Sequence, residues 1–158
     1  MKVLIADDHE LISNGVVSYL RENSKEKFEF FTAKSKLDVI DCLNRNDISI
    51  VLQDIQFGDV DGRQLMKDAL LSYPKLKFIA LSSHVDEFTV KSALSAGFNG
   101  YVSKNAPLAE IEQALIAIAK GEQYISQDIK RKMLNSILTG KNEELSLTKR
   151  ELEVLLAI

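Results

Sequence analysis

Short runs of apolar residues alternate along the chain with longer segments whose apolar positions repeat at the helical period. Four runs are four to six residues long and rich in Val, Ile, Leu or Phe, as buried parallel strands are. A fifth, shorter run is indicated by the glycine before it and by the alternation itself. The runs are Val3–Ala6, Phe28–Ala33, Ile48–Leu52, Phe78–Leu81 and Tyr101–Val102, and the helical segments are Leu11–Glu22, Leu37–Asn44, Gly62–Leu71, Asp86–Ala96 and Leu108–Lys120. Five β-then-α units predict a doubly wound α/β fold, with a five-stranded parallel sheet and helices on both faces.

After Gly121 the alternation stops, and we expect a C-terminal helical extension. Ser126 and Asp128 can cap a sixth helix within residues 122–138, whose apolar positions are Ile129, Met133, Leu134, Ile137 and Leu138. Residues 139–147 are polar and predict a linker. A Thr-x-x-Glu capping box then predicts a seventh helix over residues 148–158. The predicted organisation is therefore a domain over residues 1–121 followed by these three segments.

Composition narrows the class of protein. Of the 158 residues, 46% are hydrophobic, and 20 basic against 23 acidic side chains give a net charge of −3. The chain therefore has no excess of positive charge with which to bind nucleic acid. A single cysteine, Cys42, excludes an internal disulfide framework and a cysteine zinc site. The apolar runs are far shorter than the ~20 residues of a membrane span, and the early acidic pair is unlike a signal peptide. We expect a cytoplasmic protein without membrane contacts.

Polar side chains follow the predicted strands at the points where they end. In an open α/β sheet, ligands bind beyond the carboxyl ends of the strands. Three carboxylates, two hydroxyls and an ammonium converge at that edge: Asp7 and Asp8 after the first strand, Asp54 after the third, Ser82 and Ser83 after the fourth, and Lys104 after the fifth. Separate loops rarely deliver such complementary groups to one place by chance, so we expect a functional site here.

The predicted site has the composition of a metal-dependent phosphoryl site. Clustered carboxylates repel one another and raise each other's pKa, and a hard cation such as Mg²⁺ relieves the repulsion through oxygen ligands. With the metal present, the ammonium of Lys104 and the hydroxyl of Ser82 could hold a phosphoryl group. A carboxylate in the middle could be the nucleophile that accepts it. Asp54 is the natural choice because the third strand is central.

Four separated segments resemble, in order and spacing, the motifs of a bacterial response-regulator receiver domain. They are Ile5-Ala6-Asp7-Asp8-His9, Gln53-Asp54-Ile55 through Asp61-Gly62, Ala80-Leu81-Ser82-Ser83, and Gly100-Tyr101-Val102-Ser103-Lys104. The match covers about residues 1–121. The resemblance implies a flavodoxin-like sheet with the strand order 2-1-3-4-5.

The resemblance also implies a role for each matching residue. Asp54 would be phosphorylated by a sensor histidine kinase. Asp8 and Asp54 would ligate Mg²⁺ together with the backbone carbonyl of Gln56, while Asp7 would act largely through water. Lys104 would pair with the phosphoryl group.

Further roles follow from the same resemblance. Ser82, with Ser83 beside it, would hydrogen-bond the phosphoryl group. Ser82 would also move inward as a switch residue, and Tyr101 would swing inward with it. Gln56 and His84 lie where the family tunes the lifetime of the phosphoryl group, although an exposed spectator is the preferred interpretation of His84. His9 is interpreted as a helix-start residue rather than a ligand. In place of the Met-Pro pair common after the phosphoacceptor, this chain has Phe57-Gly58, which leaves the geometry of that loop open.

The later motifs are similar to the NarL/FixJ group, whose members carry a LuxR-type helix-turn-helix. These motifs are Asn99–Leu108, Lys120–Ser126 and Leu147–Leu155. The resemblance implies a transcription regulator that forms a homodimer on phosphorylation, through its first and fifth helices or its fourth helix and fifth strand. We expect the chain to stop in the first helix of an incomplete DNA-binding domain, as a fragment or a naturally short regulator. DNA would be bound only through the missing remainder, because residues 122–158 carry six acidic and six basic residues and no basic patch.

Three other classes of protein share parts of this pattern. A haloacid-dehalogenase-like phosphatase also forms an aspartyl phosphate, but that family has Asp-x-Asp where this chain has the adjacent pair Asp7-Asp8. A flavodoxin-like protein needs a hydroxyl-rich phosphate loop in place of those carboxylates. An unphosphorylated interaction module would normally have lost one of the site's groups. The preferred hypothesis is a phosphoacceptor that catalyses its own phosphotransfer and dephosphorylation without being a turnover enzyme.

Overall fold

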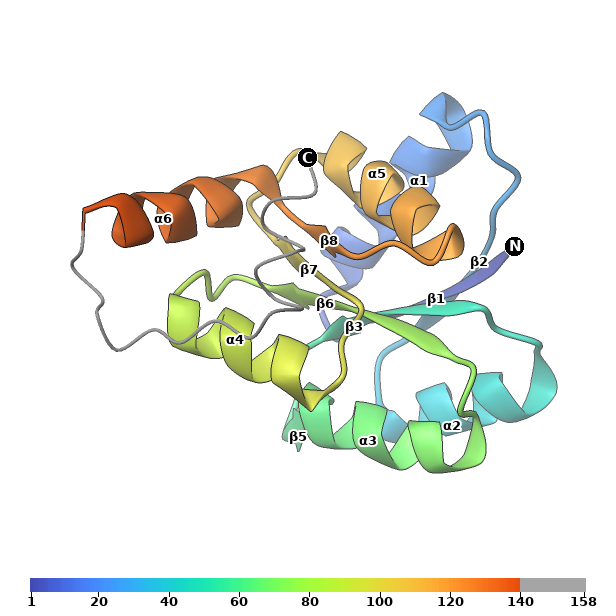
Figure 1. Ribbon diagram of the computed structural model, residues 1–158. Coiled ribbons are helices and arrows are strands. Elements are labelled where there is room, and N and C mark those ends of the chain that lie inside the picture. Colours follow the sequence, from blue (N-terminus) through green and yellow to red (C-terminus); the bar gives the residue numbers. More distant parts are fainter. Residues whose placement is uncertain (140–158) are drawn as a thin grey trace.

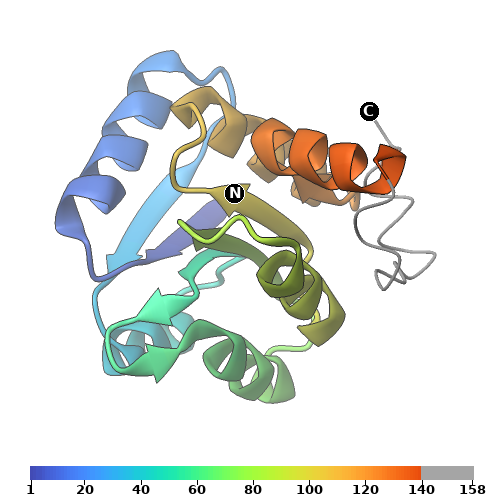
Figure 2. The ribbon, with the colours of Figure 1, turned by 90° about the vertical axis from the view of Figure 1, so that its left-hand side faces the viewer.

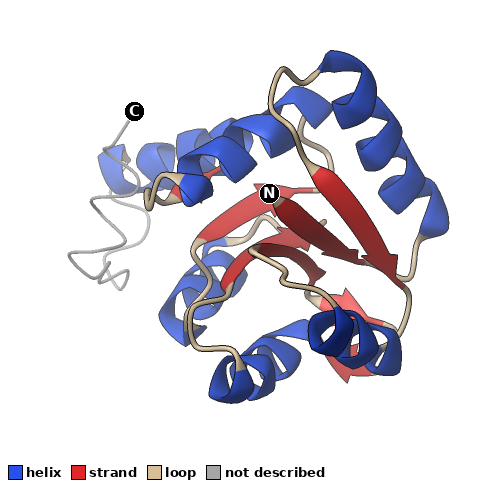
Figure 3. Cartoon of the chain, turned by 90° about the vertical axis from the view of Figure 1, so that its right-hand side faces the viewer, coloured by secondary structure: helices blue, strands red, loops and turns tan. Residues whose placement is uncertain are grey.

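The computed structural model describes residues 1–139 and contains one parallel sheet of six strands (Figures 1 and 3). The strand order is β2-β1-β3-β6-β7-β8. The strands are β1 (Lys2–Ala6), β2 (Glu29–Ala33), β3 (Ile50–Asp54), β6 (Lys77–Ser82), β7 (Gly100–Ser103) and β8 (Tyr124–Ile125). The predicted doubly wound parallel sheet is confirmed, and its first five positions have the order 2-1-3-4-5.

Helices cover both faces of the sheet (Figure 2). Residues of α1 and α5 pack in one apolar cluster with Ile5, Leu52 and Leu81, whereas residues of α2, α3, α4 and α6 pack in the other with Leu4 and Phe78. The helices are α1 (Glu10–Asn23), α2 (Lys36–Arg45), α3 (Gly62–Ser72), α4 (Glu87–Ala96), α5 (Leu108–Ala119) and α6 (Gln127–Leu138). Because alternate strand residues point to opposite faces, a central strand with apolar residues on both sides is buried throughout, as β3 is.

Two features of the fold were not predicted. The prediction of five strands was wrong, because β8 adds a sixth by pairing Tyr124 with Gly100 and Ile125 with Tyr101. A run of two residues is too short to show the strand period in a sequence. The loop after Asp54 also contains a small antiparallel hairpin, β4 (Gln56–Phe57) and β5 (Val60–Asp61). Gly58 turns that hairpin with a φ of +57°, a conformation that favours glycine.

The predicted sixth helix is confirmed as α6, which lies beside the β8 edge between α5 and α4 (Figures 1 and 2). Ile129 and Met133 are buried in the same cluster as Tyr101, so the helix extends the core of the domain. Ile137 and Leu138 at its end are 46% and 82% exposed. The linker predicted to begin at residue 139 lies almost wholly outside the described residues, and the predicted seventh helix over residues 148–158 lies entirely outside them. No helix within residues 1–139 has the length and apolar character needed to cross a membrane.

Candidate functional site

The predicted carboxylates meet at the carboxyl edge of the sheet. Strand β1 ends just before Asp7 and Asp8, and the neighbouring strand β3 ends on Asp54. Each of these carboxylates, together with His9, offers one ligand atom, and the four atoms lie within 4.8 Å of one another. Parallel pairing of β1 with β3 therefore creates the cluster that the sequence pattern predicted.

Lys104 joins this cluster from the loop after β7. Its Nζ lies 3.0 Å from Oδ2 of Asp54 and 3.1 Å from Oδ2 of Asp7. The side chain of Lys104 is only 11% exposed, so little water screens these pairs. Burial favours the neutral amine, but the pairing with Asp54 and Asp7 outweighs burial and raises the pKa of Lys104. Lys104 is therefore a cation at neutral pH and balances part of the carboxylate charge.

Asp54 is the buried carboxylate at the centre of the cluster, with a side chain only 3% exposed. Its Oδ1 accepts a hydrogen bond from the backbone N–H of Gln56 at 3.1 Å, and its Oδ2 accepts one from Lys104. Burial raises the pKa of Asp54 to about 6, and the charge of Asp7 adds to this effect, while Lys104 and the Gln56 N–H oppose it. The expected upward shift is present at Asp54, with burial as its main cause and carboxylate repulsion as a smaller one.

His9 is part of the cluster, which the sequence interpretation missed. It is the N-cap residue of α1, as expected of a helix-start residue. Its Nδ1, however, lies 3.0 Å from Oδ1 of Asp7, 3.3 Å from Oδ1 of Asp8 and 3.8 Å from Oδ2 of Asp54. The signal that could have found it is its position directly after the Asp-Asp pair, because a helix-start side chain can turn back toward the preceding strand end.

The hydroxyl residues after β6 occupy two different environments. Ser82 is buried, and its Oγ accepts a hydrogen bond from the backbone N–H of His84 at 3.1 Å. Ser83 and His84 are exposed. Tyr101 is fully buried in β7, its hydroxyl donates to the backbone carbonyl of His84 at 2.6 Å, and burial raises its pKa to about 12. Tyr101 therefore points inward and ties β7 to the loop that follows β6.

The donor set of this cluster fits a hard divalent cation. Carboxylate oxygens are the ligands that Mg²⁺ prefers, and three carboxylates are present. Lys104 lies within ion-pair distance of Oδ2 of Asp7, yet that buried oxygen makes no hydrogen bond within the described part of the chain. Lys104 brings one positive charge to three carboxylates, and a divalent cation would balance the negative charge that remains.

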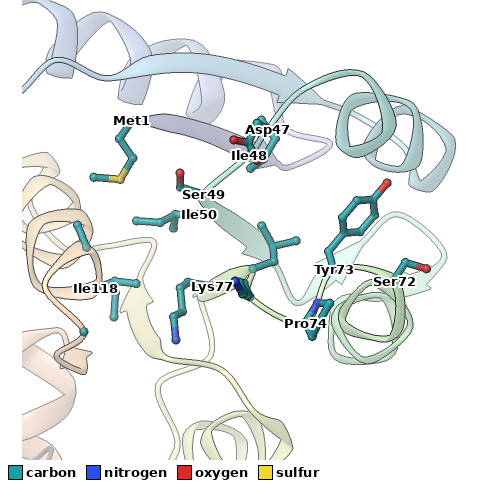
Figure 4. A pocket seen from close by; sticks show the side chains of 14 residues that line it. Met1, Asp47, Ile48, Ser49, Ile50, Ser72, Tyr73, Pro74, Lys77 and Ile118 are labelled. Carbon is teal, nitrogen blue, oxygen red and sulfur yellow. The ribbon is translucent and has the colours of Figure 1, made fainter.

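A separate cavity of about 720 Å³ lies at the opposite, amino ends of the strands (Figure 4). Its wall includes Met1 before β1, Ile50 at the start of β3 and Lys77 at the start of β6. None of the predicted site residues lines it. The carboxylate cluster thus lies at the ends of the strands and outside this cavity.

Comparison with known proteins agrees with this geometry. The family model "Response regulator receiver domain" matches residues 3–116. The response regulator protein VraR of Staphylococcus saprophyticus is 28% identical over 158 residues, covering all of this chain and 75% of its own length; VraR of Staphylococcus aureus is 29% identical with the same coverage.

Solved structures give the same family. The isolated REC domain of RcsB from Salmonella enterica serovar Typhimurium, in the apo form, has a TM-score of 0.70 and 26% identity, covering 84% of this chain and 98% of its own. A structure of the Salmonella typhimurium RcsB response regulator, at 24% identity, shares the fold with a TM-score of 0.76 over 99% of this chain and 76% of its own. The matched family, the strand order and the acidic cluster agree, and the chain belongs to the response regulator receiver domain family.

Proposed function

We propose that Asp54 is the phosphoacceptor of this two-component receiver and that it takes a phosphoryl group in a Mg²⁺-dependent reaction. The observation that carries the proposal is the pairing of a buried Asp54 carboxylate with Lys104, in contact with the further carboxylate of Asp7. Such a cluster is costly to bury and is hard to explain as a stabilising feature. Perturbed, mutually contacting titratable groups of this kind mark functional sites.

The reaction is a displacement at phosphorus. A carboxylate oxygen of Asp54 attacks the phosphorus atom and forms the new P–O bond of an acyl phosphate. The bond between phosphorus and the donor breaks, and its electron pair stays with the leaving group, which is the imidazole nitrogen of a phosphohistidine and takes up a proton afterwards. Asp54 reacts as the carboxylate, so its hydrogen bonds from Gln56 and Lys104 orient an ionised nucleophile.

Mg²⁺ would be held by Asp8 and Asp54, by the backbone carbonyl of Gln56, and by Asp7 largely through water. The bound ion would neutralise charge on the phosphoryl oxygens during transfer. Lys104 would exchange its contact with Asp54 for one with the phosphoryl group, which places its cation where charge develops. The Asp7 and Asp54 oxygens around Lys104 Nζ, 3.1 and 3.0 Å away, keep the ammonium oriented toward the site before the donor arrives.

The hydroxyl of Ser82 would donate to a phosphoryl oxygen, with Ser83 as a second candidate beside it. Ser82 Oγ now accepts from the backbone N–H of His84, which leaves its own proton available as a donor. Its inward movement would be coupled to Tyr101, and the face formed by α4 and β7 would change with them. Gln56 and His84, both exposed at the rim, would tune how quickly water removes the phosphoryl group.

The donor would be a sensor histidine kinase, since receivers of two-component systems take their phosphoryl group from such a partner. Homodimerisation on phosphorylation and transcription control through a LuxR-type DNA-binding domain belong to the same proposal, supported by the similarity to the regulators VraR and RcsB. The receiver would work in the cytoplasm as a switch that catalyses its own phosphotransfer and hydrolysis, without turnover of an external substrate.

The test is incubation of the protein with Mg²⁺ and a small phosphodonor such as acetyl phosphate, followed by intact-mass measurement. We expect one phosphoryl adduct that requires Mg²⁺ and is absent from Asp54→Asn. The matched control is Asp59→Asn, which removes an exposed carboxylate from the hairpin just beyond the site and should still form the adduct. An adduct that persists in Asp54→Asn, or one that forms equally well without Mg²⁺, would refute the assignment.

A further inference from the structure

The start of α6 is hydrogen-bonded to the end of β7 through a single residue, Ser126. The backbone N–H of Ser126 donates to the carbonyl of Tyr101 at 3.0 Å. Its Oγ accepts a hydrogen bond from the backbone N–H of Ser103 at 3.1 Å, and the residue is fully buried. The pairing of β8 with β7 ends at Ile125, so the Ser126 side chain extends it by taking the place of a strand carbonyl.

This use of the hydroxyl is unusual for the residue that begins a helix. A serine at an N-cap normally accepts from an N–H in the first turn of its own helix. Ser126 is the N-cap of α6 but makes no such bond. The N–H of Ile129, which an N-cap serine could serve, donates instead to Oδ1 of Asp128 at 2.9 Å, and the N–H of Gln127 donates to Oε2 of Glu110 in α5 at 3.2 Å. Asp128 and Glu110 thereby satisfy the start of α6, and the Ser126 hydroxyl accepts from β7 instead.

The residue that Ser126 holds is the immediate neighbour of Lys104. The backbone N–H of Lys104 donates to the carbonyl of Ser82 at 2.9 Å, on the β6 side. Successive amides of an extended strand point to opposite sides, so Ser82 and Ser126 restrain the backbone before Lys104 from both sides. The ammonium of Lys104 must reach Asp54 and Asp7 from this backbone, and its position depends on both restraints.

We infer that Ser126 is a positioning residue for Lys104 and that it couples the phosphoacceptor site to the helix α6. The inference rests on the proposed role of Asp54. It adds to the site a residue, Ser126, that lies outside the four receiver motifs of the sequence. A second contact supports the coupling, because Ile129 and Met133 of α6 pack in the same buried cluster as Tyr101. Coupling between two sites is reciprocal. A change at Asp54 that moves Lys104 therefore also changes how stably α6 is held on β7.

The first experiment compares Ser126→Ala with Ser35→Ala. Ser35 is the N-cap of α2, where its Oγ accepts from Asp38, and it has no connection to Lys104. Ser126→Ala should slow phosphorylation by acetyl phosphate by about three- to tenfold, because small displacements of a positioned group cost rate. The Mg²⁺ affinity, measured by titration calorimetry, should not fall, because the carboxylates are held by β1 and β3. Ser35→Ala should lower thermal stability without changing either quantity.

The second experiment needs no variant, so it does not depend on how well Ser126→Ala folds. Hydrogen–deuterium exchange of the wild type is compared with and without beryllofluoride, which mimics the phosphoryl group. We expect the exchange rate to change at the Ser103 amide and across residues 127–138, with α2 unaffected. Equal phosphorylation rates in Ser126→Ala and the wild type, or exchange in α6 that ignores beryllofluoride, would overturn the inference. Failure of the wild type to form any adduct would instead overturn the role of Asp54.

Discussion

The ammonium of Lys104 lies 3.0 Å from Oδ2 of Asp54, although the two residues are fifty positions apart in the chain. They come from the ends of β7 and β3, with β6 between them in the sheet. The pair therefore depends on the correct assembly of three parallel strands. The ammonium of Lys104 compensates negative charge on Asp54 and Asp7 that would otherwise be buried unpaired. Removal of Lys104 should therefore slow phosphorylation and strengthen Mg²⁺ binding.

Replacement of Lys104 by methionine should slow phosphorylation by acetyl phosphate by about tenfold or more, because one contact to the developing phosphoryl charge is worth at least ~1.4 kcal/mol. Mg²⁺ should bind more tightly, because a competing cation has left the carboxylates. Phosphorylation rate and calorimetric titration measure the two effects. Lys25→Met, which removes an exposed lysine from the loop after α1, should change neither. Weaker Mg²⁺ binding in Lys104→Met would contradict the role given to the ammonium.

Asp54→Asn should stabilise the metal-free protein at pH 7.5. Burial raises the pKa of Asp54 to about 6 from its ordinary 3.8, so the folded state holds the ionised carboxyl at a cost of roughly 1–3 kcal/mol. The melting temperature should rise by about 2–8 °C.

The gain should depend on pH in a defined direction. As pH falls below about 6 toward the ordinary value of 3.8, the wild-type carboxyl is protonated in the folded state and its cost declines, so the difference between wild type and Asp54→Asn should shrink. Thermal melts of both proteins between pH 5 and pH 8 (a window of about one to two units either side of the shifted pKa) measure this convergence. The exposed Asp47→Asn should show no such gain. A difference that grows on acidification would be inconsistent with the raised pKa.

Gly62→Ala should destabilise the protein and disturb Asp54. A Cβ at Gly62 would lie 2.3 Å from the backbone oxygen of Asp54 and 2.9 Å from Cα of Ile55, so the backbone itself must move. We expect a loss of about 1–3 kcal/mol in the free energy of unfolding and a slower phosphorylation. Urea denaturation measures the first and intact mass the second.

Gly15 provides the matched control for this substitution. It lies within α1, and a Cβ there would meet nothing within 4 Å. Gly15→Ala should therefore stabilise the protein by roughly 0.5–1 kcal/mol through helix propensity and leave phosphorylation unchanged. Similar stabilities for the two alanine variants would show that the close approach of Gly62 to Asp54 is not a constraint.

Tyr101→Phe should lower the free energy of unfolding by about 0.5–1.5 kcal/mol, because the hydroxyl donates to His84 in a partly buried setting. The ring would stay in the core, so the fold should be retained. Tyr19→Phe is the control, since Tyr19 lies in α1 and packs against the cluster on the other face of the sheet from Tyr101, and its urea midpoint should match the wild type. A Tyr101→Phe protein as stable as wild type would mean that this bond does not help to hold the loop after β6.

The sequence alone predicted the parallel sheet and the location of the acidic site, because both depend on local patterns. The buried strand β3 is apolar from Ile50 to Leu52, and the polar residue at the end of such a strand must lie at the carboxyl edge. The residue types at those ends, three carboxylates and a lysine, were enough to indicate the chemistry of the site.

Only the tertiary structure determined which residues each polar side chain contacts. The pairing of Tyr124 and Ile125 with β7 spans only two residues, so it has no period that a sequence pattern could reveal. His9 and Ser126 both begin helices, as predicted, but the His9 side chain turns back to Asp7 at the end of β1, and the Ser126 side chain accepts from Ser103 in β7. The physical reason is that a hydrogen-bonding side chain at a helix start can serve its own helix or a distant strand. The choice depends on which donors and acceptors the packing of the sheet brings within reach.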